Sequence, residues 1–135
     1  MTATRIFLGF NALIFIGYGL LCLASPSVVA DQTGMQLATG VASIEVRAMY
    51  GGLQTAVGLL CLAGAARPAL QPGVLLAMAF LFFGLASGRM FGIAVDADPG
   101  SYNILALVFE TIFAAISVAL LARRGPEQGS QTAVG

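Results

Sequence analysis

Four ionisable side chains stand inside or at the edge of stretches that are otherwise apolar enough to cross a lipid bilayer. They are Glu45 and Arg47 in one stretch, Arg89 in the next and Glu110 in the last. A charge at the centre of a membrane costs about 2.5 to 3.5 kcal/mol on insertion scales, so such residues persist mainly where they pair, line a wet cavity or do chemistry. Two acids and two arginines can neutralise one another. The sequence therefore predicts a buried polar cluster.

The elements that must position these charges are membrane helices. The chain has 135 residues, of which 59% are hydrophobic and 9% are charged, and its mean hydropathy is +0.93. This composition predicts an all-α membrane protein, a four-transmembrane-helix bundle that forms a single domain over residues 1–124. The remaining segment, 125–135, is rich in Gly, Gln, Ser and Thr, which predicts a disordered cytoplasmic tail. Each expected span has about 20 residues, as a bilayer requires, and the spans cover about 5–24, 44–64, 72–91 and 101–122.

The charged residues outside the spans predict an orientation. The arginines Arg5, Arg67, Arg123 and Arg124 all fall on one side of a four-span topology, whereas the other side carries Asp31, Asp96 and Asp98. Basic residues are retained on the cytoplasmic side of membranes. We therefore expect cytoplasmic N- and C-termini and a multi-pass protein of the cell inner membrane.

A competing interpretation treats the first apolar stretch as a cleaved signal peptide, with Val28-Val29-Ala30 as the cleavage site. The apolar run from Ile6 to Ala24 is longer than the usual signal-peptide core of about 7 to 15 residues. Its length favours a retained membrane helix, although the arginine distribution is compatible with either interpretation.

Several chemistries lack the side chains they need. The chain contains no histidine and no Cys-x-x-Cys motif, so neither a metal site nor a cofactor is expected. The two cysteines, Cys22 and Cys61, fall near opposite ends of their helices, too far apart for a disulfide. No basic run suggests nucleic-acid binding. An enzyme is the least expected class, because no activated nucleophile is visible.

The second span begins with the densest polar patch of the chain. Arg47, Tyr50 and Gln54 share one helical face with Gly58, while Glu45 points elsewhere and needs water or a partner from another helix. Together with the charges of the later spans, this patch gives the candidate polar cluster, which consists of Glu45, Arg47, Tyr50, Gln54, Arg89 and Glu110.

Small residues predict where helices approach one another closely. Gly51 and Gly52 offer such a surface in the second span, and Gly84, Gly88 and Gly92 recur at intervals of four in the third. Arg89 lies beside this glycine groove near the outer end of its span. It can therefore extend to the membrane surface or pair inward with a carboxylate.

Glu110 is the charge that is hardest to explain by exposure. It lies nine residues into the last span, about 14 Å deep at 1.5 Å per residue, which is near the middle of a bilayer. Asn103, Ala106 and Ser117 lie along the same side of this helix. Either Arg89 or Arg47 could reach Glu110, and otherwise the carboxyl group must be protonated.

The string Glu45-Val46-Arg47-Ala48-Met49-Tyr50-Gly51-Gly52, together with Ser87-Gly88-Arg89 and Glu110, resembles a bacterial family of small four-helix membrane proteins that carries a domain of unknown function. That family is similar, distantly, to the DoxX-like group. The resemblance extends from the first span to Leu121 and implies the four-helix fold, but no activity. DoxX-like proteins are associated with respiratory or oxidative-stress membrane complexes, and this chain has no redox ligand with which to share that chemistry.

Two functions remain open. In the first, the protein is a small integral membrane protein whose polar cluster is mainly structural or supports a partner, either a second copy or another membrane protein. In the alternative, it is a proton-coupled transporter or a binder of a small anionic or lipid-like substrate, which uses Glu110 and Arg47 or Arg89.

Overall fold

The structure is a computed structural model that describes residues 3–97 and 99–123. The described chain is helical, without strands, and four helical segments are long and apolar enough to cross a membrane: Ala3–Ala24, Gly40–Ala66, Pro68–Asp96 and Gly100–Ala122. The all-α fold with four apolar membrane-span helices is confirmed. The predicted tail 125–135 lies outside the described residues, as do Asp98 and Arg124.

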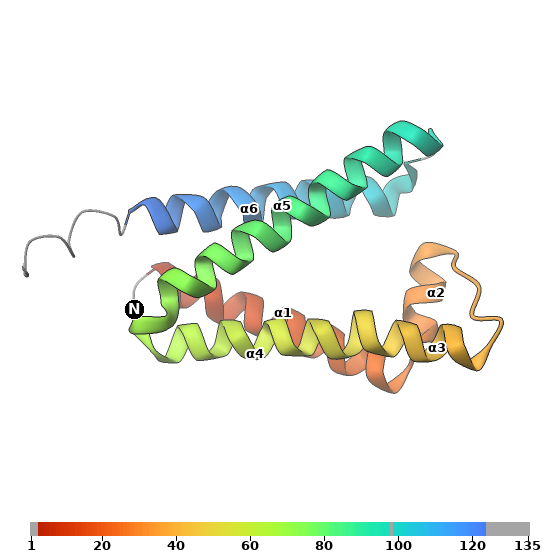
Figure 1. The fold of residues 1–135 in the computed structure, drawn as a ribbon, viewed down its shortest axis with the longest axis horizontal. Helices are drawn as coiled ribbons and strands as arrows, with labels where there is room; N and C mark the ends of the chain where they lie inside the picture. The colour runs from red at the N-terminus through yellow and green to blue at the C-terminus, as the bar shows by residue number, and fades with distance from the viewer. Residues whose placement is uncertain (1–2, 98, 124–135) are drawn as a thin grey trace, which may run out of the picture. The chain divides into compact units, whose positions relative to one another are not determined.

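The chain divides into two compact units, the first ending at Leu70 and the second beginning at Gln71. In the first unit, α3 (Gly40–Val46), a π-helix η1 (Arg47–Gly52) and α4 (Leu53–Ala66) form one long segment, and α1 (Ala3–Ala24) packs along its η1 and α4 parts (Figure 1). The short 3-10 helix η2 (Pro68–Leu70) ends the unit.

Glycines allow α1 and its partner segment to approach closely. A Cβ atom built at Gly58 would lie 2.7 Å from the backbone nitrogen of Ile16, and one at Gly51 would lie 3.1 Å from that of Leu23. Real Cβ atoms rarely come this near to a backbone, so only glycine fits at these two positions. Gly52 is exposed. The close contact with α1 is therefore made by Gly51 and Gly58, which are seven residues apart, and not by the adjacent pair Gly51 and Gly52.

The π-helix η1 coincides with the string that carries the family resemblance. The Leu53 N–H donates to the carbonyl of Ala48, five residues earlier, instead of four as in an α-helix. Such single turns insert one extra residue into a helix and occur frequently at functional sites. Hydropathy cannot predict this turn, because a π-helical turn differs from an α-helical one in its backbone hydrogen bonds and not in the polarity of its side chains.

The first connection contains more structure than its composition suggests. Residues Ser27–Thr33 form a short helix, α2, that ends at Gly34 in the left-handed conformation, with φ of 74°. Val29 of this helix packs with Cys22 and Val46, and Tyr18 and Tyr50 lie against that cluster. The next helix begins at Gly40 rather than at residue 44, because the Thr39 hydroxyl accepts a hydrogen bond from the Ala42 N–H and caps it.

The second unit consists of α5 (Gln71–Asp96) and α6 (Gly100–Ala122), which pack against each other. The ring of Phe82 meets those of Phe109 and Phe113 at centroid distances of 5.8 and 5.5 Å, a geometry that adds to the burial of apolar surface. The helix α5 continues to Asp96, beyond the end expected at residue 91. It ends where Ala97 takes a left-handed φ of 56° and donates its N–H to the Ile93 carbonyl.

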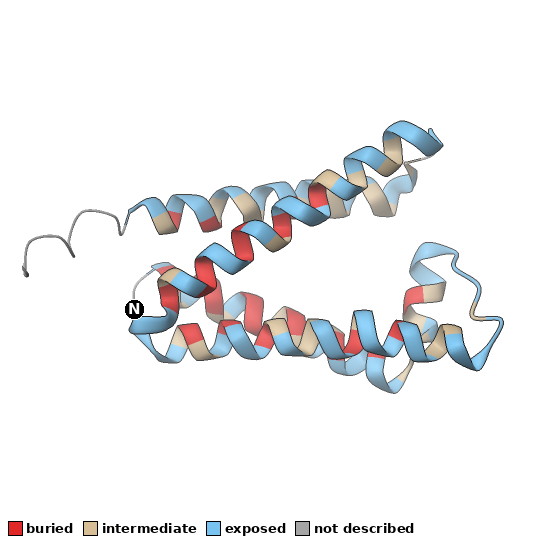
Figure 2. Cartoon of the chain, viewed as in Figure 1, coloured by how far each residue is buried: buried red, intermediate tan, exposed pale blue. Residues whose placement is uncertain are grey.

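Buried residues recur along each of the four long segments and alternate with exposed ones (Figure 2). Many of the exposed side chains are large and apolar, including Leu13, Phe80, Phe91 and Leu105, each of which is at least 70% exposed. A water-soluble protein of this size would hide such side chains. Their exposure fits helices that face lipid.

Candidate functional site: an arginine held between two helices

The centre of the site is an ion pair between the two helices of the second unit. The Arg89 guanidinium of α5 donates from Nη2 to Oε1 of Glu110 at 2.7 Å and from Nε to Oε2 at 3.1 Å. Both carboxylate oxygens of Glu110 are thus engaged by one arginine. Such two-point pairing fixes the relative orientation of the two side chains and is stronger than a single hydrogen bond.

Asn103 completes the arrangement from the first turn of α6. Its side-chain oxygen accepts a hydrogen bond from Nη1 of Arg89 at 2.7 Å, and the Tyr102 ring lies 5.7 Å from the guanidinium carbon. Asn103 and Glu110 are seven residues apart, so they stand two turns apart on the same face of α6. Arg89 therefore contacts two levels of one helix.

The Arg89–Glu110 pair is largely buried between α5 and α6. Glu110 has a side chain that is only 6% exposed, and that of Arg89 is 21% exposed. Because α5 continues to Asp96, Arg89 lies seven residues from the helix end, about 10 Å at 1.5 Å per residue. The alternative in which Arg89 extends to the membrane surface depends on a helix that ends near residue 91. In the structure, Arg89 turns toward α6 instead.

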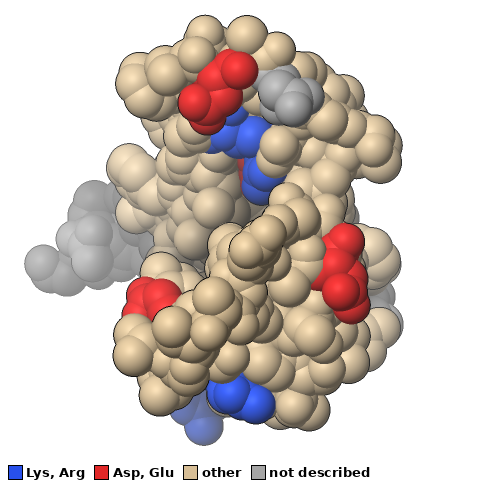
Figure 3. Space-filling model, turned by 90° about the vertical axis from the view of Figure 1, so that its right-hand side faces the viewer, with Lys and Arg blue, Asp and Glu red and all other residues tan. Residues whose placement is uncertain are grey.

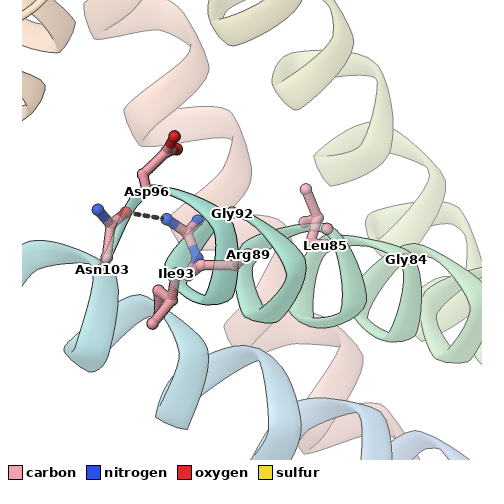
Figure 4. Close-up of a pocket in the computed structure, with 8 residues that line it drawn as sticks. Gly84, Leu85, Arg89, Gly92, Ile93, Asp96 and Asn103 are labelled. Carbon is pink, nitrogen blue, oxygen red and sulfur yellow. Dashed lines mark hydrogen bonds between the residues drawn. The ribbon is translucent and has the colours of Figure 1, made fainter. Parts of the chain in front are cut away.

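An open cavity of about 440 Å³ lies beside this pair, and all of its lining belongs to the second unit. Figure 4 shows Arg89 bonded to Asn103, with the Asp96 carboxylate pointing away from that bond. Within the second unit, no atom of α6 lies within 4 Å of a Cβ built at Gly84, Gly88 or Gly92. The lining residues are Gly84, Leu85, Gly88, Arg89, Gly92, Ile93, Asp96 and Asn103.

Comparison with known families identifies the chain. The model of a family described as Domain of unknown function (DUF4345) matches residues 3–121, which cover most of both units and every residue of the site. The chain belongs to the DUF4345 family. No curated protein and no solved structure matches it.

In this DUF4345 member, Arg47 has a different kind of partner from Arg89. Nε of Arg47 donates to the backbone carbonyl of Leu23 at 2.9 Å, one residue before the end of α1. The last carbonyls of a helix have no partner within the helix and carry its negative dipole end. Arg47 therefore caps α1 and joins it to the π-helix.

The other predicted polar residues of the DUF4345 chain occupy the first unit. Glu45 is exposed, Tyr50 is partly buried against the Cys22 cluster, and Gln54 is partly buried on α4. Arg89 and Glu110 are brought together in the second unit. The single cluster of six residues stays a prediction.

Sequence reasoning did not place two of the residues at the site. Asn103 carried a usable signal, because it shares a helical face with Glu110, whereas Asp96 was assigned to a connection. Within the described residues, no group of three His, Cys, Asp or Glu side chains could hold a metal ion. Charged side chains form small separate patches on an otherwise uncharged surface in the view of Figure 3. Cys22 and Cys61 are both buried, and neither forms a disulfide bond with a described residue.

Proposed function

We propose that this DUF4345 member is a multi-pass protein of the bacterial inner membrane, whose polar residues serve mainly to hold its helices, and which supports a membrane partner. This proposal rests on one observation, namely that both carboxylate oxygens of Glu110 accept hydrogen bonds from Arg89. The capping contact of Arg47 adds to it. Charges that are committed to helix contacts fix the register of a fold without necessarily adding net stability.

The alternative of a proton-coupled transporter has less support. A proton carrier must release its counter-charge during each cycle, and here release would break two hydrogen bonds to Arg89 while leaving a guanidinium in an apolar setting. Arg47 is also committed, to a carbonyl oxygen. The DoxX-like relation, for its part, supports a role beside other membrane proteins rather than a chemistry of its own.

The proposed orientation can be tested by cysteine labelling. In a chain whose Cys22 and Cys61 are replaced by alanine, Asp31→Cys should react with a membrane-impermeant maleimide added to intact cells. Arg67→Cys should react only after the cells are opened, because basic connections stay in the cytoplasm. The reverse pattern would place both termini outside, and labelling of both sites from outside would exclude the four-span topology.

The supporting role is tested by separating stability from chemistry. The double variant Arg89→Gln/Glu110→Gln removes both charges but lets two amides bond across the same helices. If the charges are structural, the double variant should accumulate in membranes and migrate at the wild-type assembly size on a native gel, whereas Glu110→Gln alone should accumulate less. A double variant with full abundance but a smaller assembly size would contradict a purely structural role for these charges.

A further inference from the structure

The cavity beside Arg89 is not accounted for by the structural role of the ion pair. Its volume of about 440 Å³ falls in the range of pockets that bind small molecules. Gly84, Gly88 and Gly92 add no side chain to the lining, and no atom of α6 lies within 4 Å of a Cβ built at any of the three. A Gly-lined wall lets a ligand approach a helix backbone closely.

The charges that border the cavity indicate the sign of a ligand. Arg89 is neutralised by Glu110, to which it is bound through two hydrogen bonds, so it offers little net attraction to an anion. Asp96 also borders the cavity, is exposed, and forms no ion pair with a described residue. Glu110 does not line the cavity, but because it neutralises Arg89 from behind the lining, the negative charge of Asp96 is the lining charge that is left without a counter-charge. A cation is therefore favoured over an anion.

The walls indicate the rest of the ligand. Leu85 and Ile93 stand beside the glycines and give the cavity an apolar side. Ligand sites commonly combine a mostly apolar wall with a few placed polar groups. An ammonium group at Asp96 would thus place an attached apolar body along the glycine wall.

We propose that this cavity binds an organic cation, namely an ammonium group carried on an apolar or amphiphilic body, with Asp96 as the counter-charge and Gly84, Gly88 and Gly92 as the floor. This proposal goes beyond the structural role of the Arg89–Glu110 pair. In it, the pair borders the ligand without adding net charge. The ammonium could belong to a free amine or to the headgroup of an aminophospholipid, and the experiment below distinguishes the two sources.

The test measures binding of benzyltrimethylammonium to the full chain in a non-ionic detergent by calorimetry, with benzenesulfonate as a probe of similar size and opposite charge. We expect the cation to bind at least about tenfold more tightly than the anion. Asp96→Asn should weaken cation binding about fivefold, as expected for the loss of one partly exposed charge pair. The matched control Asp31→Asn changes an exposed aspartate of the first unit and should have no effect.

A second variant tests the shape of the site without changing its charge. A Cβ at Gly88 meets no atom of α6 within 4 Å, so in Gly88→Leu the pair of α5 and α6 should fold normally while the leucine fills the cavity and abolishes cation binding. A short-chain phosphatidylethanolamine that displaces the probe, while the matching phosphatidylglycerol does not, would identify a lipid headgroup as the source. If neither lipid displaces it, the source is a free amine.

Three results would overturn the proposal. The first is equal binding of the cation and the anion, and the second is equal binding to the Asp96→Asn and Asp31→Asn variants. The third is a wild-type chain that binds no cation but forms a dimer that Gly88→Leu disrupts, which would show that the groove holds a helix of a second copy. None of these results changes the expected stability of the Arg89–Glu110 variants, so the two proposals can fail separately.

Discussion

Breaking the Arg89–Glu110 pair from either side should be costly, and removing both charges should be much less so. At about 4 Å between charge centres and an effective dielectric constant of about 20, the attraction is about 4 kcal/mol. Desolvation of the two ions offsets most of it, so the pair adds little net stability. Removing one partner is different, because the other charge is left buried and uncompensated, at a cost of about 3 to 5 kcal/mol.

Exposure decides where in that range each variant falls. Arg89 is 21% exposed, so water can partly solvate it in Glu110→Gln, and we expect a loss of about 3 kcal/mol. Glu110 is 6% exposed, so Arg89→Gln should cost at least as much. The double variant should lose clearly less than either single variant, because the pair adds little net stability, which gives a coupling energy of more than about 3 kcal/mol.

The assay must report on the second unit, because Cys22 and Cys61 both lie in the first. Ser117 is fully buried on α6, and Ser117→Cys in a chain without the native cysteines gives a thiol that reacts with a fluorogenic dye only on unfolding. A loss of about 3 kcal/mol should lower the midpoint by about 10 °C. If the two single losses simply add in the double variant, the side chains are not energetically coupled and the reasoning is refuted.

Two further predictions concern the first unit and the glycine groove. Gly58→Ala should destabilise the protein by more than about 2 kcal/mol, because its Cβ would meet the Ile16 backbone. Gly84→Ala, whose Cβ meets no atom of α6 within 4 Å, should instead stabilise its helix by about 0.5 to 1 kcal/mol. Comparable losses at both sites would contradict the packing described for α1. Arg47→Gln should cost about 0.5 to 1.5 kcal/mol through the weakened cap on α1, and the exposed Glu45 serves as the control, since Glu45→Gln should leave the midpoint unchanged. The first-unit variants are measured as thermal midpoints with the buried native cysteines as reporters, and Gly84→Ala with the Ser117→Cys reporter of the second unit.

The sequence is sufficient for the four helices, because hydropathy over about 20 residues reports directly on the length a bilayer demands. It is also sufficient for the polar face of α6, because Asn103, Glu110 and Ser117 follow a helical period. It is insufficient for α2 and for the start of α3, which depend on the turn at Gly34 and on the cap at Thr39. Local hydrogen bonds of this kind do not alter hydropathy.

The sequence also could not predict the partner of each arginine, for a geometric reason. Arg47 and Arg89 both have long side chains that could reach Glu110 from an adjacent helix. The choice between them depends on which helices form a hairpin, on the extension of α5 to Asp96, and on the π-helix that positions Arg47. Each of these features is set by packing between segments that are distant in sequence.

The four charges within the candidate spans differ in burial, and this difference explains their different partners. Glu45 is exposed and has no counter-charge among the described residues. Arg47 is exposed as a residue and bonds only a carbonyl at the end of a helix, where the dipole supplies about half a negative charge. Arg89 and Glu110 are the most buried of the four and neutralise each other completely. Desolvation costs most for the buried pair, and these two residues are the ones that receive a full counter-charge.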